Sequence, residues 1–281
     1  MRMQNTLLER RLEEAGTAAN AEPAEARSQQ LQRLWLVVPC YNDSARLSQF
    51  LPSLLEELQD APMETNLLVV DDGSVDQEKN AVSKLVSGLQ GEFPLLHSPL
   101  FEVPNQGKGA AILQGWEAAE QTDWLGFLDA DGAIPGREVK RVLKLITSRG
   151  AERPRRAFFS SRIKMRGREV RRSLSRHLSG RIFATFVGMM IDPGIYDSQC
   201  GFKMIPAAVY PKIRPLLQER RFAFDVELLA ALNHVGCPVE EVAVDWYDIP
   251  GSKVSLLKDS VRMFHAVRKI AERKQQWRAV S

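Results

Sequence analysis

The sequence predicts an α/β fold with a mixed, mostly parallel sheet that carries helices on both faces. Continuously apolar runs of strand length, such as 34–39 and 67–70, alternate with longer segments whose apolar residues recur at helical spacing. Such apolar strands are typical of parallel sheets, because these sheets are buried on both faces and have no polar side. The alternation continues along most of the chain without an internal repeat.

The chain is long enough for one large domain with short appendages. It has 281 residues, 44% of them hydrophobic, and a formal net charge of +3. No apolar run approaches the ~20 residues of a membrane-spanning helix, and the N-terminus lacks a signal-peptide pattern, so we expect a cytoplasmic protein. Cys40, Cys200 and Cys237 are odd in number and far apart, which favours reduced thiols over disulfides or a zinc site.

Composition divides the chain into three regions. Residues 1–30 are polar and rich in Ala, Glu, Arg and Gln, and we interpret them as a leader that is helical or disordered. Residues 31–252 hold the strand and helix alternation and are expected to form the main domain. Residues 253–281 predict a basic amphipathic helix, with an apolar face made by Val254, Leu257, Val261, Phe264, Val267 and Ile270.

The elements of the first half follow from apolar spacing and capping residues. Asn42, Asp43 and Ser44 offer N-cap side chains directly after the first strand, and Gly107 opens a later helix. The expected order is strand 34–39, helix 44–58, strand 67–70, helix 77–89, short strand 95–96, helix 107–120 and strand 124–128.

The second half contains a strongly basic stretch. Between residues 153 and 181 there are ten Arg and one Lys against a single acid, Glu169. The expected elements are helix 135–148, strand 156–161, helix 170–190, a short strand entered by the polar turn 197–203, a helix from 224, strand 239–246 and a helix from 254 onward.

Four carboxylates follow predicted strands at the points where the strands end. Asp71 and Asp72 follow the strand at 67–70, and Asp129 and Asp131 follow the strand that begins at Trp124. In open parallel sheets, ligands bind outside the carboxyl ends of the strands. The sequence therefore predicts a binding site at this rim, with the four acids along it.

Asp129 and Asp131 are one residue apart in an extended segment, so their side chains point to the same side. Two neighbouring carboxylates repel each other unless a cation lies between them. Mg²⁺ is such a cation, since it takes one or two carboxylates together with substrate phosphates and waters. An acidic turn at a strand end is the alternative interpretation.

Six short motifs occur in the order known from one enzyme family. They are Val38–Asn42, Val69–Ser74, Asn105–Gly109, Asp129–Gly132, Asp197–Lys203 and Ile249–Lys253. Together they resemble the signature of family 2 glycosyltransferases, which have the GT-A (nucleotide-diphospho-sugar transferase) fold. The last two resemble the branch of dolichyl-phosphate β-glucosyltransferase and dolichyl-phosphate mannose synthase, closer to the glucosyl member. The resemblance covers about residues 34–255 and implies a catalytic domain at 31–252.

The resemblance also implies roles for individual residues. Asp129 and Asp131 would hold Mg²⁺ or Mn²⁺ against the donor diphosphate. A Gln often follows as a further ligand in mannose synthases, but Ala133 stands at that position here, so the ligand is absent or replaced by water. Asp71 would contact the base or ribose, and Lys108 would lie beside the sugar nucleotide. The implied donor-binding residues are Pro39, Tyr41, Asn42, Asp71, Asp72, Lys108 and Asp129.

Acceptor chemistry gives two further expectations. A sugar hydroxyl would need a carboxylate base, and Asp197, Asp225 and Glu227 are candidates, with Asp197 the chosen catalytic residue. A lipid phosphate needs positioning more than deprotonation, and the arginine fork binds phosphate oxygens bidentately. The basic stretch supplies such residues, although a solvated positive surface would have the same composition. The expected acceptor-phosphate ligands are Arg162, Arg171, Arg172 and Arg176.

We therefore expect an inverting, metal-dependent glycosyltransferase that moves glucose from UDP-glucose to a polyprenyl phosphate such as dolichyl phosphate. The same fold with GDP-mannose or a soluble hydroxyl acceptor is the enzymatic alternative. A nucleic-acid-binding protein that uses residues 153–181 is the non-enzymatic one. Because the four rim carboxylates would repel a polyanion, we expect no nucleic-acid partner.

A lipid acceptor requires access to a bilayer. The basic amphipathic segments 170–190 and 254–270 fit peripheral contact with the cytosolic membrane face, and packing against the sheet is their alternative role. The oligomeric state is left open by the sequence.

Overall fold

The computed structural model places residues Gln32–Ser281 in one compact unit. The residues that it describes are 31–102, 104–148, 156–163, 165, 167–171, 190–191, 194–249 and 256–280.

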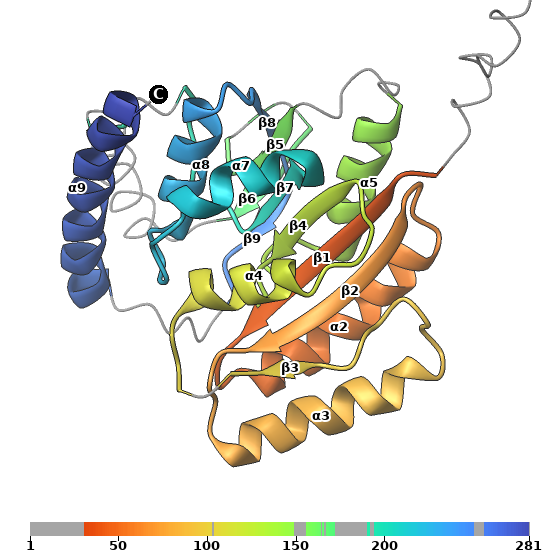
Figure 1. Cartoon of the computed structure of the whole chain (residues 1–281). Helices are drawn as coiled ribbons and strands as arrows, with labels where there is room; N and C mark the ends of the chain where they lie inside the picture. The colour runs from red at the N-terminus through yellow and green to blue at the C-terminus, as the bar shows by residue number, and fades with distance from the viewer. Residues whose placement is uncertain are drawn as a thin grey trace, which may run out of the picture. The chain divides into compact units, whose positions relative to one another are not determined.

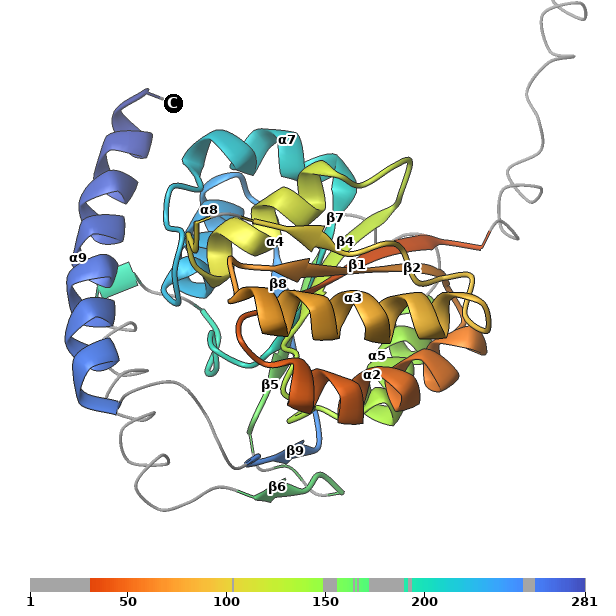
Figure 2. The same ribbon diagram turned by 90° about the horizontal axis from the view of Figure 1, so that it is seen from below.

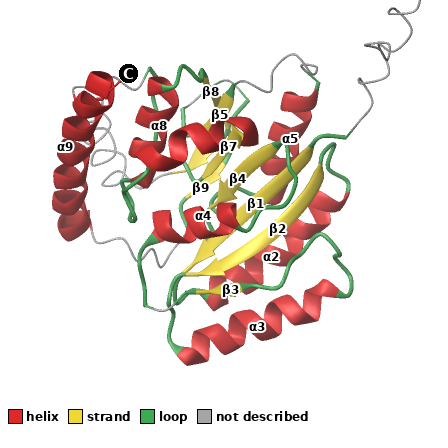
Figure 3. Cartoon of the chain, viewed as in Figure 1, coloured by secondary structure: helices red, strands yellow, loops and turns green. Residues whose placement is uncertain are grey.

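A seven-stranded sheet runs through the centre of this unit (Figure 3). Its strand order is β3-β2-β1-β4-β7-β5-β8, and β7 runs antiparallel to both of its neighbours while the other pairs are parallel. The mixed, mostly parallel sheet predicted from the sequence is therefore confirmed. The strands are β1 (Arg33–Cys40), β2 (Glu64–Asp71), β3 (Leu100–Phe101), β4 (Trp124–Leu128), β5 (Ala157–Ser161), β7 (Phe202–Pro206) and β8 (Val239–Ala243).

Helices cover both faces of the sheet (Figures 1 and 2). One face is covered by α2 (Ser44–Gln59), α3 (Asp76–Gln90) and α5 (Gly136–Thr147). The other face is covered by α4 (Lys108–Glu117), α7 (Tyr210–Ile213) and α8 (Phe224–His234), and α9 (Leu256–Val280) packs on α8. Short 3₁₀ turns, η2 (Ala207–Val209) and η3 (Arg214–Leu216), flank α7.

Alternate residues of β1 show why the strands are continuously apolar. Leu34, Leu36 and Val38 belong to the hydrophobic core under one face, whereas Trp35 and Val37 belong to the core under the other. Successive side chains of a strand point to opposite faces, so a strand covered on both sides must be apolar at every position. This confirms the reasoning from which the fold class was predicted.

A second, two-stranded sheet corrects two of the predicted elements. β6 (Val170–Arg171) pairs in parallel with β9 (Trp246–Tyr247). The helix expected at 170–190 is therefore wrong at its start, and residues 172–189 lie outside the described part. The strand expected at 239–246 is in fact two strands, β8 and β9, in different sheets.

The short strand expected at 95–96 lies later in the chain. Leu96 forms a single bridge with Leu67, but the paired strand β3 is Leu100–Phe101. Runs this short carry too little periodicity for a strand to be located by sequence alone.

The C-terminal helix α9 is partly a core element. Val267, Ile270 and Trp277 are buried in the same hydrophobic core as α8. Among the described residues, no helix has both the length and the apolar character needed to cross a membrane.

Candidate active site

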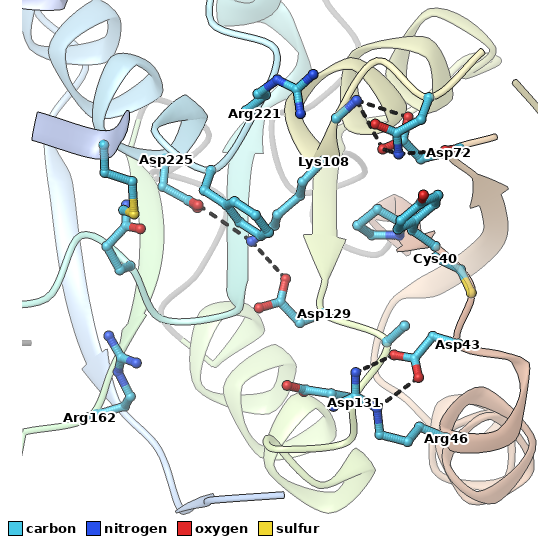
Figure 4. Close-up of a pocket in the computed structure, with 18 residues that line it drawn as sticks. Cys40, Asp43, Arg46, Asp72, Lys108, Asp129, Asp131, Arg162, Arg221 and Asp225 are labelled. Atoms are coloured by element: carbon cyan, nitrogen blue, oxygen red, sulfur yellow. Dashed lines mark hydrogen bonds and ion pairs between the residues drawn. The ribbon is translucent and has the colours of Figure 1, made fainter. Parts of the chain in front are cut away.

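A pocket of about 510 Å³ lies at the carboxyl rim of the sheet, where the sequence predicted a site (Figure 4). The loops after β1, β2, β4 and β5 contribute to its wall, and so do the N-terminal ends of α4 and α8. It is lined by Pro39, Cys40, Tyr41, Asp43, Arg46, Asp72, Asn105, Gly107, Lys108, Asp129, Ala130, Asp131, Arg162, Gln199, Arg221, Phe222, Asp225 and Met263.

Asp129 is positioned by the chain that enters β7. Its backbone N–H donates to the Gly201 carbonyl at 2.9 Å. A Cβ atom at Gly201 would lie 2.5 Å from Oδ2 of Asp129, so a side chain at this position would push the Asp129 carboxylate away from its place. The Asp129 side chain is 34% exposed and faces the pocket.

Asp131 lies in the turn that follows. Its Oδ1 accepts the Ala133 N–H at 3.0 Å, and Gly132 adopts the positive φ of 72° that this turn requires. Burial raises the pKa of Asp131, and the neighbouring charge of Asp129 raises it further. The Ala133 N–H and the positive charge of Arg46 oppose this rise only in part.

These two carboxylates fit a divalent cation of the Mg²⁺ or Mn²⁺ type. Both line the pocket, and the destabilised negative charge of Asp131 is the kind of charge that a bound cation would stabilise. In the part of the chain that the structure describes, no group of three His, Cys, Asp or Glu side chains could hold a metal. A cation at Asp129 and Asp131 would therefore depend on substrate phosphates and waters for its remaining ligands.

Lys108, the first residue of α4, contacts both the pocket carboxylate Asp129 and the buried Asp225. Its Nζ lies 2.7 Å from Oδ1 of Asp129 and 3.4 Å from Oδ2 of Asp225, as the dashed lines in Figure 4 show. Burial alone would lower the pKa of Lys108, but the two carboxylates outweigh it and raise the pKa above its ordinary value. The ammonium is therefore firmly charged.

A second buried lysine extends this network. Lys203 is fully buried on β7, with Nζ 2.5 Å from Oδ1 of Asp225, and it donates to the Cys200 carbonyl at 2.6 Å. Burial alone would raise the pKa of Asp225, but Lys108 and Lys203 hold it below the ordinary value. Negative and positive charges thus alternate from Asp129 to Lys108, Asp225 and Lys203.

Asp72 fixes the start of α4. Its carboxylate accepts the backbone N–H groups of Gln106 and Gly107 and the side-chain amide of Asn105, at 2.8 to 2.9 Å. Asp71 is fully buried, accepts the N–H and hydroxyl of Ser74, and is absent from the pocket wall. The expected contact between Asp71 and the base or ribose stays a prediction that this geometry does not favour, whereas Asp72 does line the pocket.

The loop after β1 is tied to the loop after β2. Asn42 has a positive φ of 48°. Its backbone N–H donates to the Ser74 hydroxyl oxygen at 2.7 Å, and its side-chain Oδ1 accepts the Val75 N–H at 2.9 Å. Asn42 itself does not line the pocket, but Pro39 and the 44% exposed Tyr41 do. Asn42 thus shapes the wall that its neighbours present.

Arg162 and Asp197 were predicted in separate roles, and the structure brings them together. Arg162 Nε and Nη2 donate to the two Asp197 oxygens, each at 2.7 Å, and the guanidinium lies 5.6 Å from the centre of the Trp246 ring. Arg162 lines the pocket, whereas Asp197, 7% exposed, does not. Asp197 therefore positions Arg162, and its role as a catalytic base stays a prediction that this pairing does not favour.

The remaining predicted residues lie elsewhere. Glu227 is fully buried and accepts from the backbone N–H groups of Gln218 and Glu219 and from the Arg273 guanidinium. The Arg171 side chain and the whole of Arg172 and Arg176 lie outside the described residues, so their acceptor roles stay predictions.

The structure adds two arginines that the sequence did not single out. Arg46 lines the pocket and pairs with Asp43 at 2.5 Å, and Arg221 lines it beside the 40% exposed Phe222. Arg46 lies in the first turn of α2, and Arg221 lies three residues before the start of α8, so only their place near these two helix ends could have identified them.

Comparisons with known proteins agree with this geometry. The sequence model described as Glycosyl transferase family 2 matches residues 35–212. Dolichyl-phosphate beta-glucosyltransferase of Dictyostelium discoideum is 31% identical over 238 residues, which is 82% of this chain and 71% of that protein. The enzyme of the same name from Homo sapiens is 31% identical over 230 residues, or 79% of this chain and 70% of that protein.

Solved structures show the same fold at low sequence identity. Glucosyl-3-phosphoglycerate synthase from Mycobacterium tuberculosis, crystallised with Mn²⁺, UDP-glucose and phosphoglyceric acid, has a TM-score of 0.63 and 16% identity, covering 87% of this chain and 80% of that one. Mannosyl-3-phosphoglycerate synthase from Rubrobacter xylanophilus has a TM-score of 0.56 and 16% identity, covering 89% and 76%. The fold of this chain is therefore GT-A, as the resemblance implied.

Proposed function

This chain belongs to glycosyl transferase family 2 and is a glycosyltransferase, and we propose that it moves glucose from UDP-glucose to a polyprenyl phosphate such as dolichyl phosphate, with inversion at the anomeric carbon. Relatives named dolichyl-phosphate beta-glucosyltransferase, of which this chain covers about 70%, support the sugar and the acceptor. The family membership removes the reason for the nucleic-acid-binding alternative.

The donor is proposed to lie across the rim pocket. Pro39, Tyr41 and Asp72 form the wall for the nucleoside, and Asp129 and Asp131 face the diphosphate. A divalent cation held by Asp129 and Asp131 would supply Lewis-acid neutralisation of the charge that develops on the leaving diphosphate. The positively charged ammonium group of Lys108 lies at the same end of the pocket, beside Asp129.

One observation carries the choice of a phosphate acceptor. All three carboxylates considered as bases are held by cations: Asp197 by Arg162, Asp225 by Lys203, and Glu227 by Arg273. In the first two pairs the cation stabilises the ionised carboxylate, which makes it a poor proton acceptor. Glu227 has no exposed surface and does not line the pocket, so it cannot reach an acceptor there. A lipid phosphate is already ionised near neutral pH and needs no base, so this arrangement favours it over a hydroxyl acceptor.

Arg162 is proposed to position that phosphate. Its guanidinium stands at the pocket wall and is held in one plane by Asp197 and by the Trp246 ring. A fixed, planar donor set suits phosphate oxygens. The acceptor reaches the pocket from a membrane surface, and we propose peripheral contact with the cytosolic face through the exposed basic side of α9.

A transfer assay tests the proposal. The full chain is incubated with radiolabelled UDP-glucose or GDP-mannose and with dolichyl phosphate, with and without EDTA, and counts are taken in the organic phase. We expect counts from UDP-glucose alone, lost with EDTA. Organic-phase counts from GDP-mannose would show that the proposed donor is wrong. Labelled product that stays in the aqueous phase would indicate a soluble acceptor, and activity that survives EDTA would refute the metal dependence.

A further inference from the structure

Lys108 forms an ion pair with Asp129, one of the two carboxylates that would hold the cation. Its Nζ lies 2.7 Å from Asp129 Oδ1, and the Lys108 side chain is only 14% exposed. Figure 4 shows the ammonium between the carboxylates of Asp129 and Asp225. In the donor-free protein, therefore, this ammonium is in direct ion-pair contact with Asp129.

The backbone on both sides of Lys108 is held by close contacts. The preceding N–H, of Gly107, is held by both oxygens of Asp72 at 2.9 Å. A Cβ atom at the following residue, Gly109, would lie 2.7 Å from Phe224 Cβ, so the start of α4 is packed tightly against α8. Any displacement of the positive charge must come from the flexible Lys108 side chain.

Asp225 offers the displaced ammonium a destination. Its Oδ2 lies 3.4 Å from Lys108 Nζ, while its Oδ1 lies 2.5 Å from Lys203 Nζ. Lys203 is fixed by the Cys200 carbonyl and lies about 5.1 Å from the ring centres of both Phe127 and Phe159. Asp225 can therefore hold Lys108 more closely on one oxygen without releasing Lys203 from the other.

We propose that Lys108 competes with the divalent cation for Asp129 and shifts toward Asp225 when that cation binds with the donor. An ammonium and a divalent cation repel each other, so both cannot keep the same contact with one carboxylate. In the empty pocket Lys108 neutralises the metal ligand and weakens cation binding until the donor diphosphate adds its own negative charge. The inference rests on the proposed metal-dependent function.

The test measures Mn²⁺ binding rather than turnover. Free Mn²⁺ is followed by electron paramagnetic resonance during titration of the full chain without nucleotide. Lys108→Met should lower the Kd for Mn²⁺ by about tenfold, the scale of a typical coupling between two ligands. The variant should fold, because Lys203 remains as the partner of Asp225.

Arg46→Met is the matched control. Arg46 is also a pocket cation, and its charge acts on Asp131, but its ion pair is with Asp43. It therefore reports the general effect of removing one positive charge beside the metal carboxylates. We expect it to lower the Kd by no more than about threefold. An effect equal to that of Lys108→Met would overturn the proposal.

A double-mutant cycle separates displacement from a simple field effect. Asp225→Asn removes the destination, so in the wild-type background it should raise the Kd for Mn²⁺ several-fold. In the Lys108→Met background it should change nothing, because no lysine is left to displace. An equal rise in both backgrounds would overturn the proposal. Thermal melting checks that Asp225→Asn folds; if it does not, the comparison of Lys108→Met with Arg46→Met still decides.

UDP separates failure of this inference from failure of the proposed function. If neither the wild type nor Lys108→Met binds Mn²⁺, with or without UDP, the metal assignment and the inference both fall. If the wild type binds Mn²⁺ and Lys108→Met binds it with the same Kd, only the competition by Lys108 is overturned.

Discussion

Asp131 is a carboxylate whose surroundings oppose its own charge. Its pKa is raised in the folded protein, so ionisation costs more there than in the unfolded chain. The stability that the neutral form provides is present at low pH and is lost as the pH rises through the folded-state pKa. Near neutral pH the ionised Asp131 therefore destabilises the folded protein as long as no cation is bound beside it.

Asp131→Asn should separate activity from stability. We expect turnover to fall by at least about 10³-fold, since a charge that stabilises the transition state is lost. In metal-free buffer at pH 7, the variant should melt above the wild type, because the neutral amide avoids the cost of a buried charge. The amide oxygen can still accept the Ala133 N–H, so the turn should persist.

Activity and melting temperature are both measured over a pH series. The difference in melting temperature should shrink as the pH falls through the raised folded-state pKa of Asp131, and it should disappear below the ordinary value of 3.8 for Asp. Undiminished turnover of Asp131→Asn would refute the metal assignment. A melting-temperature difference that grows as the pH falls would contradict the raised pKa of Asp131.

Arg162→Ala should harm the acceptor side selectively. We expect the KM for the lipid phosphate to rise at least about tenfold, the loss of one charge-assisted phosphate contact, while the KM for the donor changes by less than about threefold. Steady-state kinetics with each substrate varied in turn gives both values. Equal losses would contradict the acceptor role.

Arg168→Ala is the control for Arg162→Ala. The Arg168 side chain is 26% exposed, close to the 22% of Arg162, and it pairs with Glu138 at 3.0 Å outside the pocket. Loss of this ion pair should lower stability without a change in either KM. A rise in the acceptor KM of Arg168→Ala would mean that the effect at Arg162 is a general loss of structure.

The site was predictable where its residues end apolar strands. Asp72, Asp129 and Asp131 were found this way, because the carboxyl ends of parallel strands meet at one rim. Lys203 could not be assigned a role, since nothing in the sequence distinguishes a buried lysine from an exposed one. The pairing of Arg162 with Asp197 could not be predicted, because the two residues are 35 positions apart. They meet only because β7, which follows Asp197, pairs antiparallel with β5, which precedes Arg162.

Among the elements, α9 is held to α8 by Glu227. This carboxylate has no exposed surface and accepts from two backbone N–H groups as well as from Arg273 on α9. Burial raises the pKa of Glu227, although these donors oppose the rise. The buried acid Glu227 thus adds an ion pair to the apolar contacts that pack α9 on α8.

Glu227→Gln should loosen this anchor. A glutamine keeps only one acceptor oxygen, so either Arg273 or the two backbone N–H groups lose their partner. We expect a loss of about 2 kcal/mol in the free energy of unfolding, seen in denaturant melts, and faster proteolysis within α9.

Glu272→Gln is the control: Glu272 pairs with Arg268 at 3.2 Å but is 60% exposed. It should change stability by no more than about 0.5 kcal/mol, and equal effects would refute the anchor.

Long elements were predicted well and short ones poorly, for a physical reason. The order and type of β1, α2, β2, α3, α4, β4 and α5 follow from runs of apolar residues that each element needs for its own burial. β6 and β9 have two residues each, and they exist because Val170 meets Trp246 across 76 positions. That pairing is a property of the folded chain, so no local pattern records it.

At the scale of the whole molecule, α9 has two faces with different partners. Val267, Ile270 and Trp277 face the core, whereas Arg268 and Lys269 are exposed. Deleting the helix would therefore damage the core as well as any membrane contact, which makes deletion a poor test of the proposed peripheral binding. Substitutions on the exposed face keep the packing and change only the charge.

Arg268→Gln/Lys269→Gln should weaken binding to vesicles that contain anionic lipid. Each basic residue near such a surface contributes about 1 kcal/mol, so losing two should lower partitioning at least about tenfold in a sedimentation assay at moderate salt. Lys84→Gln/Lys212→Gln removes the same charge from exposed positions on α3 and α7, and should have a much smaller effect. If both pairs lower partitioning equally, attraction depends on net charge alone; if neither does, α9 serves only the core, and lipid acceptors must reach the rim pocket by another surface.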